Sequence, residues 1–171
     1  SSSSSSPSSF TITEPNPLSV SGSVSSDFNG QDISCFGESD GEITGAVTSG
    51  AAPFEYSLDN VNWQLSDPVF DNLSSGTYTL YYRDANLCEN QETFTLIEPT
   101  DLSGTISVSS PIFCFGGTGS ITISTNGGTS GFTGFTYSLN GGAPQINNST
   151  FTAPGNQFNT ITIEDANSCT F

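Results

Sequence analysis

Histidine, lysine and methionine are absent from the 171-residue sequence, and Arg83 is its single basic side chain. Against this one cation stand 17 acidic side chains, which give a formal net charge of −16. Phosphate groups and anionic lipid headgroups are bound through cations, so we expect neither nucleic acid nor an anionic membrane surface as a partner. Without histidine the commonest general base and any Ser-His-Asp triad are missing, and we expect no enzyme.

Long apolar runs are missing as well, and none approaches the roughly 18 residues of a membrane-spanning helix. We therefore expect no membrane insertion. The first nine residues, SSSSSSPSS, contain neither the charged region nor the apolar region of a secretory signal peptide. We expect this Ser-rich start to be a linker, a cloning remnant or poorly defined sequence.

The chain contains two copies of one segment. FTITEPNPLSVSGSVSS (10–26) aligns with FTLIEPTDLSGTISVSS (94–110), ISCFGESDGEIT (33–44) with IFCFGGTGSIT (112–122), and TYTLYYRDANLC (77–88) with NTITIEDANSC (159–169). The offset of about 80 residues exceeds the usual 20–50 of solenoid repeats, so each copy should be a domain with its own core. We predict a Ser-rich start and the tail of a preceding repeat at 1–17, a first repeat at 18–99 and a second, C-terminally cut repeat at 100–171.

Each copy has the sequence pattern of short strands. The segments 43–47, 54–58 and 77–82 are rich in β-branched and aromatic residues, and Gly, Asn, Asp and Pro separate them. No segment shows the 3.6-residue period of an amphipathic helix. About seven short strands per copy predict an all-β fold of tandem immunoglobulin-like antiparallel β-sandwich domains.

The four cysteines predict one disulfide within each copy. Cys35 and Cys88 lie near the beginning and the end of the first copy, and Cys114 and Cys169 take the same places in the second. Such cysteines in an acidic, lysine-free chain are typical of an oxidising compartment. Closing the loop between Cys35 and Cys88 would stabilise a copy by about 4 kcal/mol on the loop-entropy model. The alternatives are a Cys88–Cys114 bond across the junction, or four buried free thiols.

Both copies also contain the pattern DAN-x-C, in RDANLC and EDANSC. Asp84 and Asn86 are turn-forming residues whose side chains bond the backbone two residues on, which would end the preceding strand. The alternative is calcium, because Asp84 and Asn86, like Asp165 and Asn167, place oxygen ligands at alternate positions. The run DFNGQD at 27–32 is a second calcium candidate, although it lacks the glycine and the flanking helices of an EF-hand loop. A solvated acidic loop would explain the same acids.

Two aromatic residues of the first copy are candidates for ligand binding. Trp63 and Tyr56 could stack against a sugar ring, and the second copy has no tryptophan. The alternative is that these rings pack in the core or in cross-strand pairs.

Four segments of the first copy form a recognisable succession of motifs: CFGESDGEIT (35–44), PFEYSLDNVNWQ (53–64), FDNLSSGTYTLYYRDANLC (70–88) and IEP (97–99). As a set they resemble the SprB-type repeat of very large surface adhesins from gliding bacteria. The resemblance covers 33–99 well and 112–169 less well. It implies an extracellular, outer-membrane-attached filament, exported by type IX secretion and carried by the gliding machinery. The family has no assigned catalytic residues.

The sequence pattern and the resemblance to the SprB-type repeat together predict that the chain is a structural or adhesive repeat segment of a large adhesin that serves surface attachment and gliding motility. Expected partners are neighbouring repeats of the same chain, an external surface or polysaccharide, and proteins of the secretion or gliding machinery. The junction should be stiff, because Pro99 fixes its own φ and lacks an N–H donor. The alternative is a carbohydrate-binding or calcium-dependent recognition module in the same array.

Overall fold

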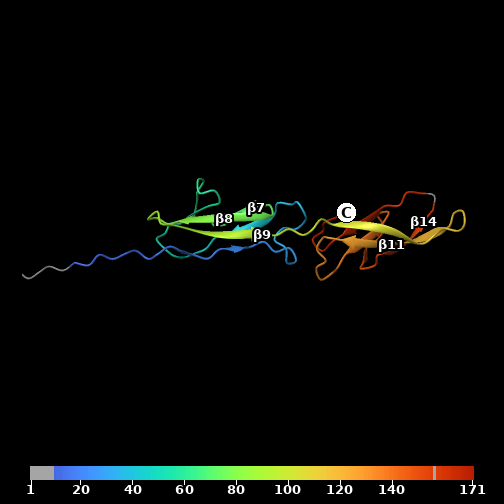
Figure 1. Cartoon of the computed structure of the whole chain (residues 1–171), viewed down its shortest axis with the longest axis horizontal. Helices are drawn as coiled ribbons and strands as arrows, with labels where there is room; N and C mark the ends of the chain where they lie inside the picture. The colour runs from blue at the N-terminus through green and yellow to red at the C-terminus, as the bar shows by residue number, and fades with distance from the viewer. Residues whose placement is uncertain (1–9, 156) are drawn as a thin grey trace, which may run out of the picture. The chain divides into compact units, whose positions relative to one another are not determined.

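The computed structural model describes residues 10–155 and 157–171, so the Ser-rich start, residues 1–9, lies outside the described residues. Strands and no helix occur among the described residues, which confirms the all-β class (Figure 1). The strands are β1 (Ser19–Val20), β2 (Ser23–Val24), β3 (Gly41–Thr44), β4 (Val47–Ser49), β5 (Glu55–Ser57), β6 (Gln64–Leu65), β7 (Val69–Leu73), β8 (Gly76–Arg83), β9 (Glu89–Leu96), β10 (Ser103–Ser110), β11 (Thr118–Asn126), β12 (Thr136–Leu139), β13 (Gln145–Ile146), β14 (Thr150–Pro154) and β15 (Ile161–Glu164). The described part of the chain contains no helix long and apolar enough to cross a membrane.

The two copies share one strand arrangement. In the second copy the sheets have the orders β10-β11-β14 and β13-β12-β15. The first copy repeats these orders as β2-β3-β7 and β6-β5-β8, with β9 added beside β8. The pairings run antiparallel, and matching registers place Tyr56 opposite Tyr82 and Tyr137 opposite Ile163. The prediction of tandem antiparallel β-sandwich repeats is thereby confirmed.

The chain divides into two compact units that cut across the predicted repeats. One unit comprises the described residues up to Gly22 together with Gly45–Pro68 and Thr79–Glu92. The other comprises Ser23–Thr44, Val69–Tyr78 and Thr93–Phe171. The second unit therefore holds part of the first repeat together with the whole of the second. The repeat boundaries at 17/18 and 99/100 stay a prediction.

The first unit is organised around a pair of tyrosines. The rings of Tyr56 and Tyr82 meet edge to face with centroids 5.7 Å apart, a favourable geometry for two aromatic quadrupoles. Leu80 is fully buried with them, and burial raises the pKa of both tyrosines. The hydroxyl of Tyr82 donates to Glu92, which satisfies its polar group at the edge of the core.

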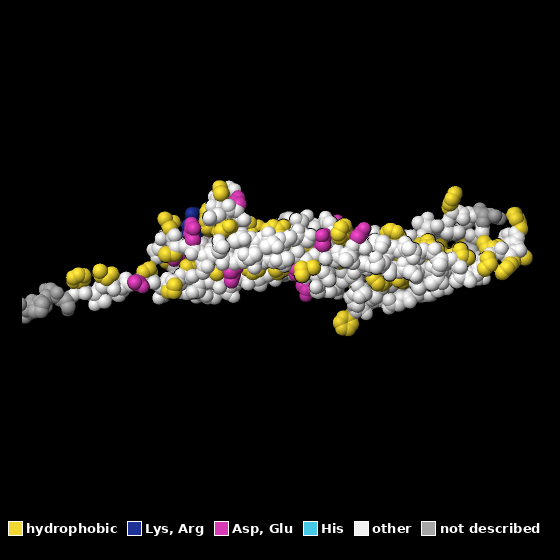
Figure 2. Space-filling view, in the orientation of Figure 1, with side chains coloured by type: hydrophobic (Ala, Val, Ile, Leu, Met, Phe, Trp, Pro, Cys, Tyr) yellow, Lys and Arg dark blue, Asp and Glu magenta, His cyan; other side chains and the backbone are white. Residues whose placement is uncertain are grey.

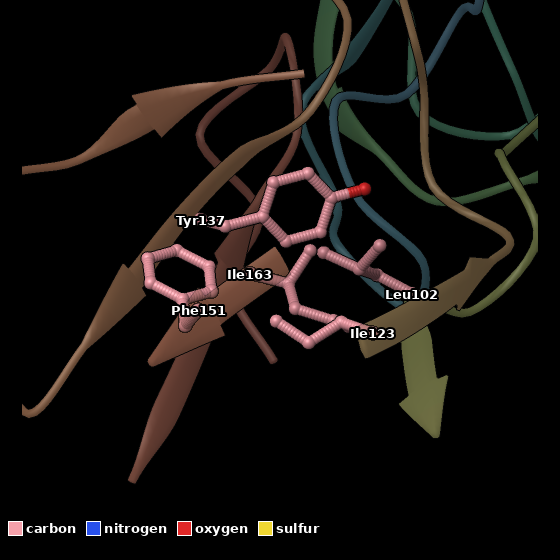
Figure 3. Packing of buried hydrophobic residues seen from close by; sticks show 5 residues of the cluster. All are labelled: Leu102, Ile123, Tyr137, Phe151 and Ile163. Carbon is pink, nitrogen blue, oxygen red and sulfur yellow. The ribbon is translucent and has the colours of Figure 1, made fainter. Parts of the chain in front are cut away.

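The second unit contains the core of the second repeat. Leu102, Ile123, Tyr137, Phe151 and Ile163 pack together (Figure 3). Leu102 directly precedes β10, and the other four come from both sheets of the sandwich. Alternate residues of a strand point to the same face, which is how β14 directs Phe151 inward while its neighbours stay exposed. The Tyr137 hydroxyl lies 2.9 Å from the Thr125 hydroxyl, so its polar end is hydrogen-bonded.

The acidic residues are unevenly distributed. Thirteen of the 17 lie between Asp27 and Glu98, and three follow from Asp101 onward. Figure 2 shows the single basic side chain directly beside acidic ones, in agreement with the 2.6 Å ion pair between Arg83 and Glu55. The second repeat keeps the same strand orders with only three acids, so most acids of the first repeat are not needed for this strand arrangement.

Candidate functional site: the junction closed by Cys35 and Cys169

In each repeat one strand, β8 in the first and β15 in the second, ends in a tight turn. One aspartate organises this turn, which we call the corner. In the first repeat the Asp84 carboxylate accepts hydrogen bonds from the backbone N–H groups of Ala51, Asn86 and Cys88, at 2.9 to 3.1 Å. The bond to Asn86 is the predicted Asx-type turn. Burial alone would raise the pKa of Asp84, but these N–H donors outweigh burial and hold the pKa below its ordinary value.

The corner of the second repeat has the same geometry. The carboxylate of Asp165 accepts from the backbone N–H groups of Thr129, Asn167 and Cys169, at 2.8 to 2.9 Å. Three N–H donors therefore converge on each of the two aspartates that were candidate calcium ligands. Calcium at these corners stays a prediction, and an ion there would have to use the remaining oxygen lone pairs.

Asn167 of this corner contacts the first repeat. Its amide nitrogen donates to the carbonyl oxygens of Phe28 and Ser34, at 3.1 and 2.9 Å. Its amide oxygen accepts from Asn29 at 2.6 Å. All four residues belong to the second compact unit. Asn167, predicted as a metal ligand, thus uses both ends of its amide to hold the two repeats together.

The acidic run DFNGQD forms the other side of this contact. Phe28 and Gln31 bond each other through their backbones, and Asn29 and Gly30 between them have φ of 54° and 88°. This is the Asn-Gly hairpin turn that requires positive φ at both central positions. The Asp27 carboxylate accepts from the N–H of Gly30. The turn presents Asn29 to the second repeat, a role that the sequence analysis missed.

A disulfide closes the junction. Cys35 is bonded to Cys169, with their Cα atoms 5.7 Å apart, while Cys88 and Cys114 are exposed free thiols. The predicted pairs Cys35–Cys88 and Cys114–Cys169 are therefore wrong, and so is the alternative Cys88–Cys114. The bond joins the two repeats and leaves neither with a disulfide of its own.

The strand layout explains this correction. Cys88 directly precedes β9, whereas Ile33, two residues before Cys35, donates to the carbonyl of Ile97 directly after β9. An eight-residue strand spans about 26 Å, and a disulfide requires Cα atoms within about 7 Å. The two cysteines of one repeat thus lie at opposite ends of a strand, while those of adjacent repeats meet.

Further bonds hold the linker between the repeats. The carboxylate of Asp32 accepts from the N–H of Ile97. The N–H of Gly37 donates to the carboxylate of Glu98. This bond and, to a smaller extent, a bond from the hydroxyl of Ser75 hold the pKa of Glu98 below its ordinary value. Two positions of the loop around Cys35 are therefore tied to Ile97 and Glu98, which directly precede Pro99.

A hollow of about 330 Å³ lies at the same junction. Its lining includes the disulfide, Phe36 and Glu38 from the first repeat, and Asp101 and Asp165 from the second. No basic side chain lines it. The hollow is part of the contact surface between the repeats.

The predicted aromatic ligand site is divided by the fold. Tyr56 is buried in the core, so it offers no ring face to a ligand. Trp63 is half-buried, and the guanidinium of Arg83 lies 4.2 Å from the centre of its ring. Arg83 also pairs with Glu55. Of the two predicted residues, Trp63 alone is accessible, and Arg83 already covers one of its faces.

Residues 28–62 and 103–144 match the family model of the SprB repeat. This confirms the resemblance predicted from the motifs, once in each repeat. SprB repeats are segments of cell-surface, adhesin-like proteins and are a structural, non-catalytic type of module.

No curated protein matches the chain. Among solved structures, the three N-terminal domains of the Hoc outer capsid protein of bacteriophage RB49 are 14% identical, with a TM-score of 0.45. That match covers 91% of this chain, which spans 57% of the Hoc chain. Fibronectin(III)-like modules of Clostridium thermocellum CbhA are 10% identical over 88% of each chain, with a TM-score of 0.37.

Proposed function

We propose that the chain is a tension-bearing segment of a filamentous cell-surface adhesin that serves attachment and gliding motility. The single observation that carries this proposal is the disulfide between Cys35 and Cys169. A repeat segment that only spaced two domains would need no covalent bond across their junction. A segment under tension gains from one, because an S–S bond does not rupture where strand hydrogen bonds do.

The bond provides a short path for force through the molecule. Tension that enters before Cys35 crosses directly to Cys169 and leaves two residues later at Phe171. In the isolated chain, the 134-residue separation between the cysteines lies in a closed loop that bears no load. Even complete unfolding of the second repeat would then add no length to the molecule.

Single-molecule pulling on the two ends of the chain tests this path. Under oxidising conditions we expect unfolding events whose added length comes only from residues outside the loop. Reduction should release the loop and add roughly 450 Å, since each extended residue spans about 3.3–3.6 Å.

Matched cysteine variants make the result specific. Cys169→Ser should release the full length without reductant, whereas Cys88→Ser should behave like the original chain. Equal contour lengths before and after reduction would contradict the proposed force path.

Gliding motility and export by type IX secretion are supported by the resemblance to the SprB-type repeat. They can be tested in cells that carry the complete protein, by labelling this segment at the surface. We expect surface label to disappear when type IX secretion is disabled. Unchanged label would argue for another route of export while leaving the mechanical proposal intact.

Recognition of an external polysaccharide is a second candidate, favoured by exposed apolar side chains beside Trp63. Val61 and Leu65 flank Trp63 in the sequence and are both exposed. Binding on a glycan array that Trp63→Ala abolishes, and that Phe115→Ala leaves unchanged, would support it. Retention of binding in Trp63→Ala would assign the sugar contact elsewhere.

A further inference from the structure

The disulfide at the junction uses one cysteine of each repeat and leaves the other two, Cys88 and Cys114, as exposed thiols. We propose that both are halves of further disulfides of the same kind. Cys114 would bond the DAN-x-C cysteine of a following SprB repeat, and Cys88 the C-F-G cysteine of a preceding one. The inference rests on the proposed function only in requiring that such repeats follow one another.

The corner that contains Cys88 is a geometric copy of the corner that contains Cys169. In both, the aspartate N–H donates to the cysteine carbonyl at 3.0 Å, for Asp84 to Cys88 and for Asp165 to Cys169. The residue before the cysteine has φ of 62° in one corner and 66° in the other. Cys88 is therefore held in the backbone conformation in which Cys169 forms its bond.

Asn86 supplies an independent indication that the first corner lacks a partner. Its counterpart, Asn167, makes three hydrogen bonds to the first repeat. The side chain of Asn86 is exposed and makes no hydrogen bond among the described residues. The same amide in the same corner thus has its acceptors in one case and lacks them in the other.

The loop around Cys114 likewise matches the loop around Cys35. Glu38 donates to the Cys35 carbonyl at 3.1 Å, and Gly117 donates to the Cys114 carbonyl at 3.0 Å. The glycine two residues after each cysteine has φ of 79° and 77°, respectively. Both loops therefore present their cysteine from the same turn.

Exposed aromatic rings beside Cys114 fit a surface that another repeat would cover. Phe36 lines the junction hollow and is 56% exposed, whereas its counterpart Phe115 is 99% exposed. Phe113, next to Cys114, is 87% exposed. Docking of a second repeat would remove the apolar surface of these exposed rings from water, which favours the contact.

The second repeat lacks a counterpart of the DFNGQD turn, so the contact at Cys114 would have fewer hydrogen bonds. Only the carbonyl of Phe113, the counterpart of Ser34, would accept from the incoming asparagine. The disulfide would consequently contribute a larger share of the stability at that junction.

The bond forms by thiol–disulfide exchange. One thiolate attacks a small-molecule disulfide such as oxidised glutathione, releasing one glutathione thiolate and leaving a mixed disulfide. The second thiolate displaces the remaining glutathione. Two protein thiols are thereby oxidised by two electrons, and one oxidised glutathione becomes two reduced molecules.

The test mixes two single variants of this chain, Cys88→Ser and Cys114→Ser, in a glutathione redox buffer. Each variant is present at about 1 mM, near the effective concentration of tethered domains. Each variant keeps one of the two thiols. We expect more heterodimer, linked through Cys88 and Cys114, than the sum of the two homodimers, which is the value for random pairing. Peptide mapping identifies the linked residues.

Random proportions, or no linked dimer, would overturn the proposal. Adding Asn86→Ala to the Cys114→Ser chain should lower the heterodimer yield severalfold, because the incoming corner loses its amide. An unchanged yield would also overturn the proposal, since the thiols would then be pairing without the docked geometry. The pulling experiment depends on Cys35 and Cys169 alone, so either proposal can fail without the other.

Discussion

The side-chain amide of Asn167 donates to the carbonyl oxygen of Ser34 at 2.9 Å. The donor belongs to the DAN-x-C corner of the second repeat and the acceptor to the C-F-G loop of the first. This relationship turns a motif that looks like a simple turn into a contact between repeats. The aspartate shapes the corner, and the asparagine uses that shape to reach its neighbour.

The two asparagines provide a matched pair of substitutions. Asn167→Ala removes the donor to Phe28 and Ser34 and the acceptor for Asn29, so we expect a loss of about 1–3 kcal/mol in the free energy of unfolding. Asn86→Ala should change this free energy by less than about 0.5 kcal/mol, as for other exposed positions. Urea unfolding measures both, and equal effects would contradict the contact.

Cysteine substitutions discriminate the observed disulfide from the pairing predicted by sequence. On the loop-entropy model a bond across 134 residues stabilises by about 5 kcal/mol. Cys35→Ser and Cys169→Ser should each remove this stabilisation, and reduction of the original chain should do the same. Cys88→Ser and Cys114→Ser should leave the urea midpoint unchanged. A loss in Cys88→Ser as large as in Cys35→Ser would instead support a bond within the first repeat.

The strands and the tandem organisation were predictable because they depend on local signals. β-branched runs bounded by Gly, Asn and Pro define strands, and two aligned segments define repeats. The aspartate of DAN-x-C was also predictable, because its hydrogen bond is to a residue two positions away. Each of these features is written within a short stretch of sequence.

The disulfide was not predictable in the same way. Two repeats with two cysteines each give the same sequence pattern whether the bond lies within a repeat or between repeats. The choice depends on β9, which separates Cys88 from the loop of Cys35 by a whole strand. The prediction of Tyr56 as a ligand-binding residue did not anticipate its burial for a related reason. The burial of its ring depends on the pairing of Tyr56 with Tyr82 in the sheet, which the sequence does not state. The Asn-Gly signal in DFNGQD could have revealed the turn, although not its partner.

Asp84, in the corner of the first repeat, predicts a dependence of stability on pH. The pKa of Asp84 is lowered in the folded chain from an ordinary value of 3.8, so the folded state favours the ionised carboxylate. Its stabilising contribution is then complete above about pH 5 and is lost as the pH falls through the lower folded value. We expect urea midpoints to be constant from pH 7 to about pH 5 and to decline below it.

Asp84→Asn isolates this contribution. The amide keeps one acceptor oxygen but turns an N–H₂ group toward an N–H donor, so we expect a lower urea midpoint at pH 7 than in the original chain. The variant should also show a shallower decline in acid. Glu89→Gln, at an exposed position in the same repeat, serves as the control. An unchanged acid decline in Asp84→Asn would place the titrating group elsewhere.

The glycine of the motif C-F-G-x-x-x-G-x-I has a packing reason that a substitution can test. A Cβ at Gly41 would overlap the side chain of Leu96 and lie 2.7 Å from Ile33 and 2.9 Å from the backbone oxygen of Leu73. The side chains could move, but the backbone oxygen belongs to the neighbouring strand β7. At Gly45 the nearest atoms are side chains at 3.0 Å or more, which can shift by a few tenths of an ångström.

We therefore expect Gly41→Ala to lower the free energy of unfolding by about 1–3 kcal/mol and Gly45→Ala to lower it by less. Urea unfolding of the two variants side by side measures the difference, and an equal or reversed order would show that β3 and β7 are not packed as closely as the structure has them.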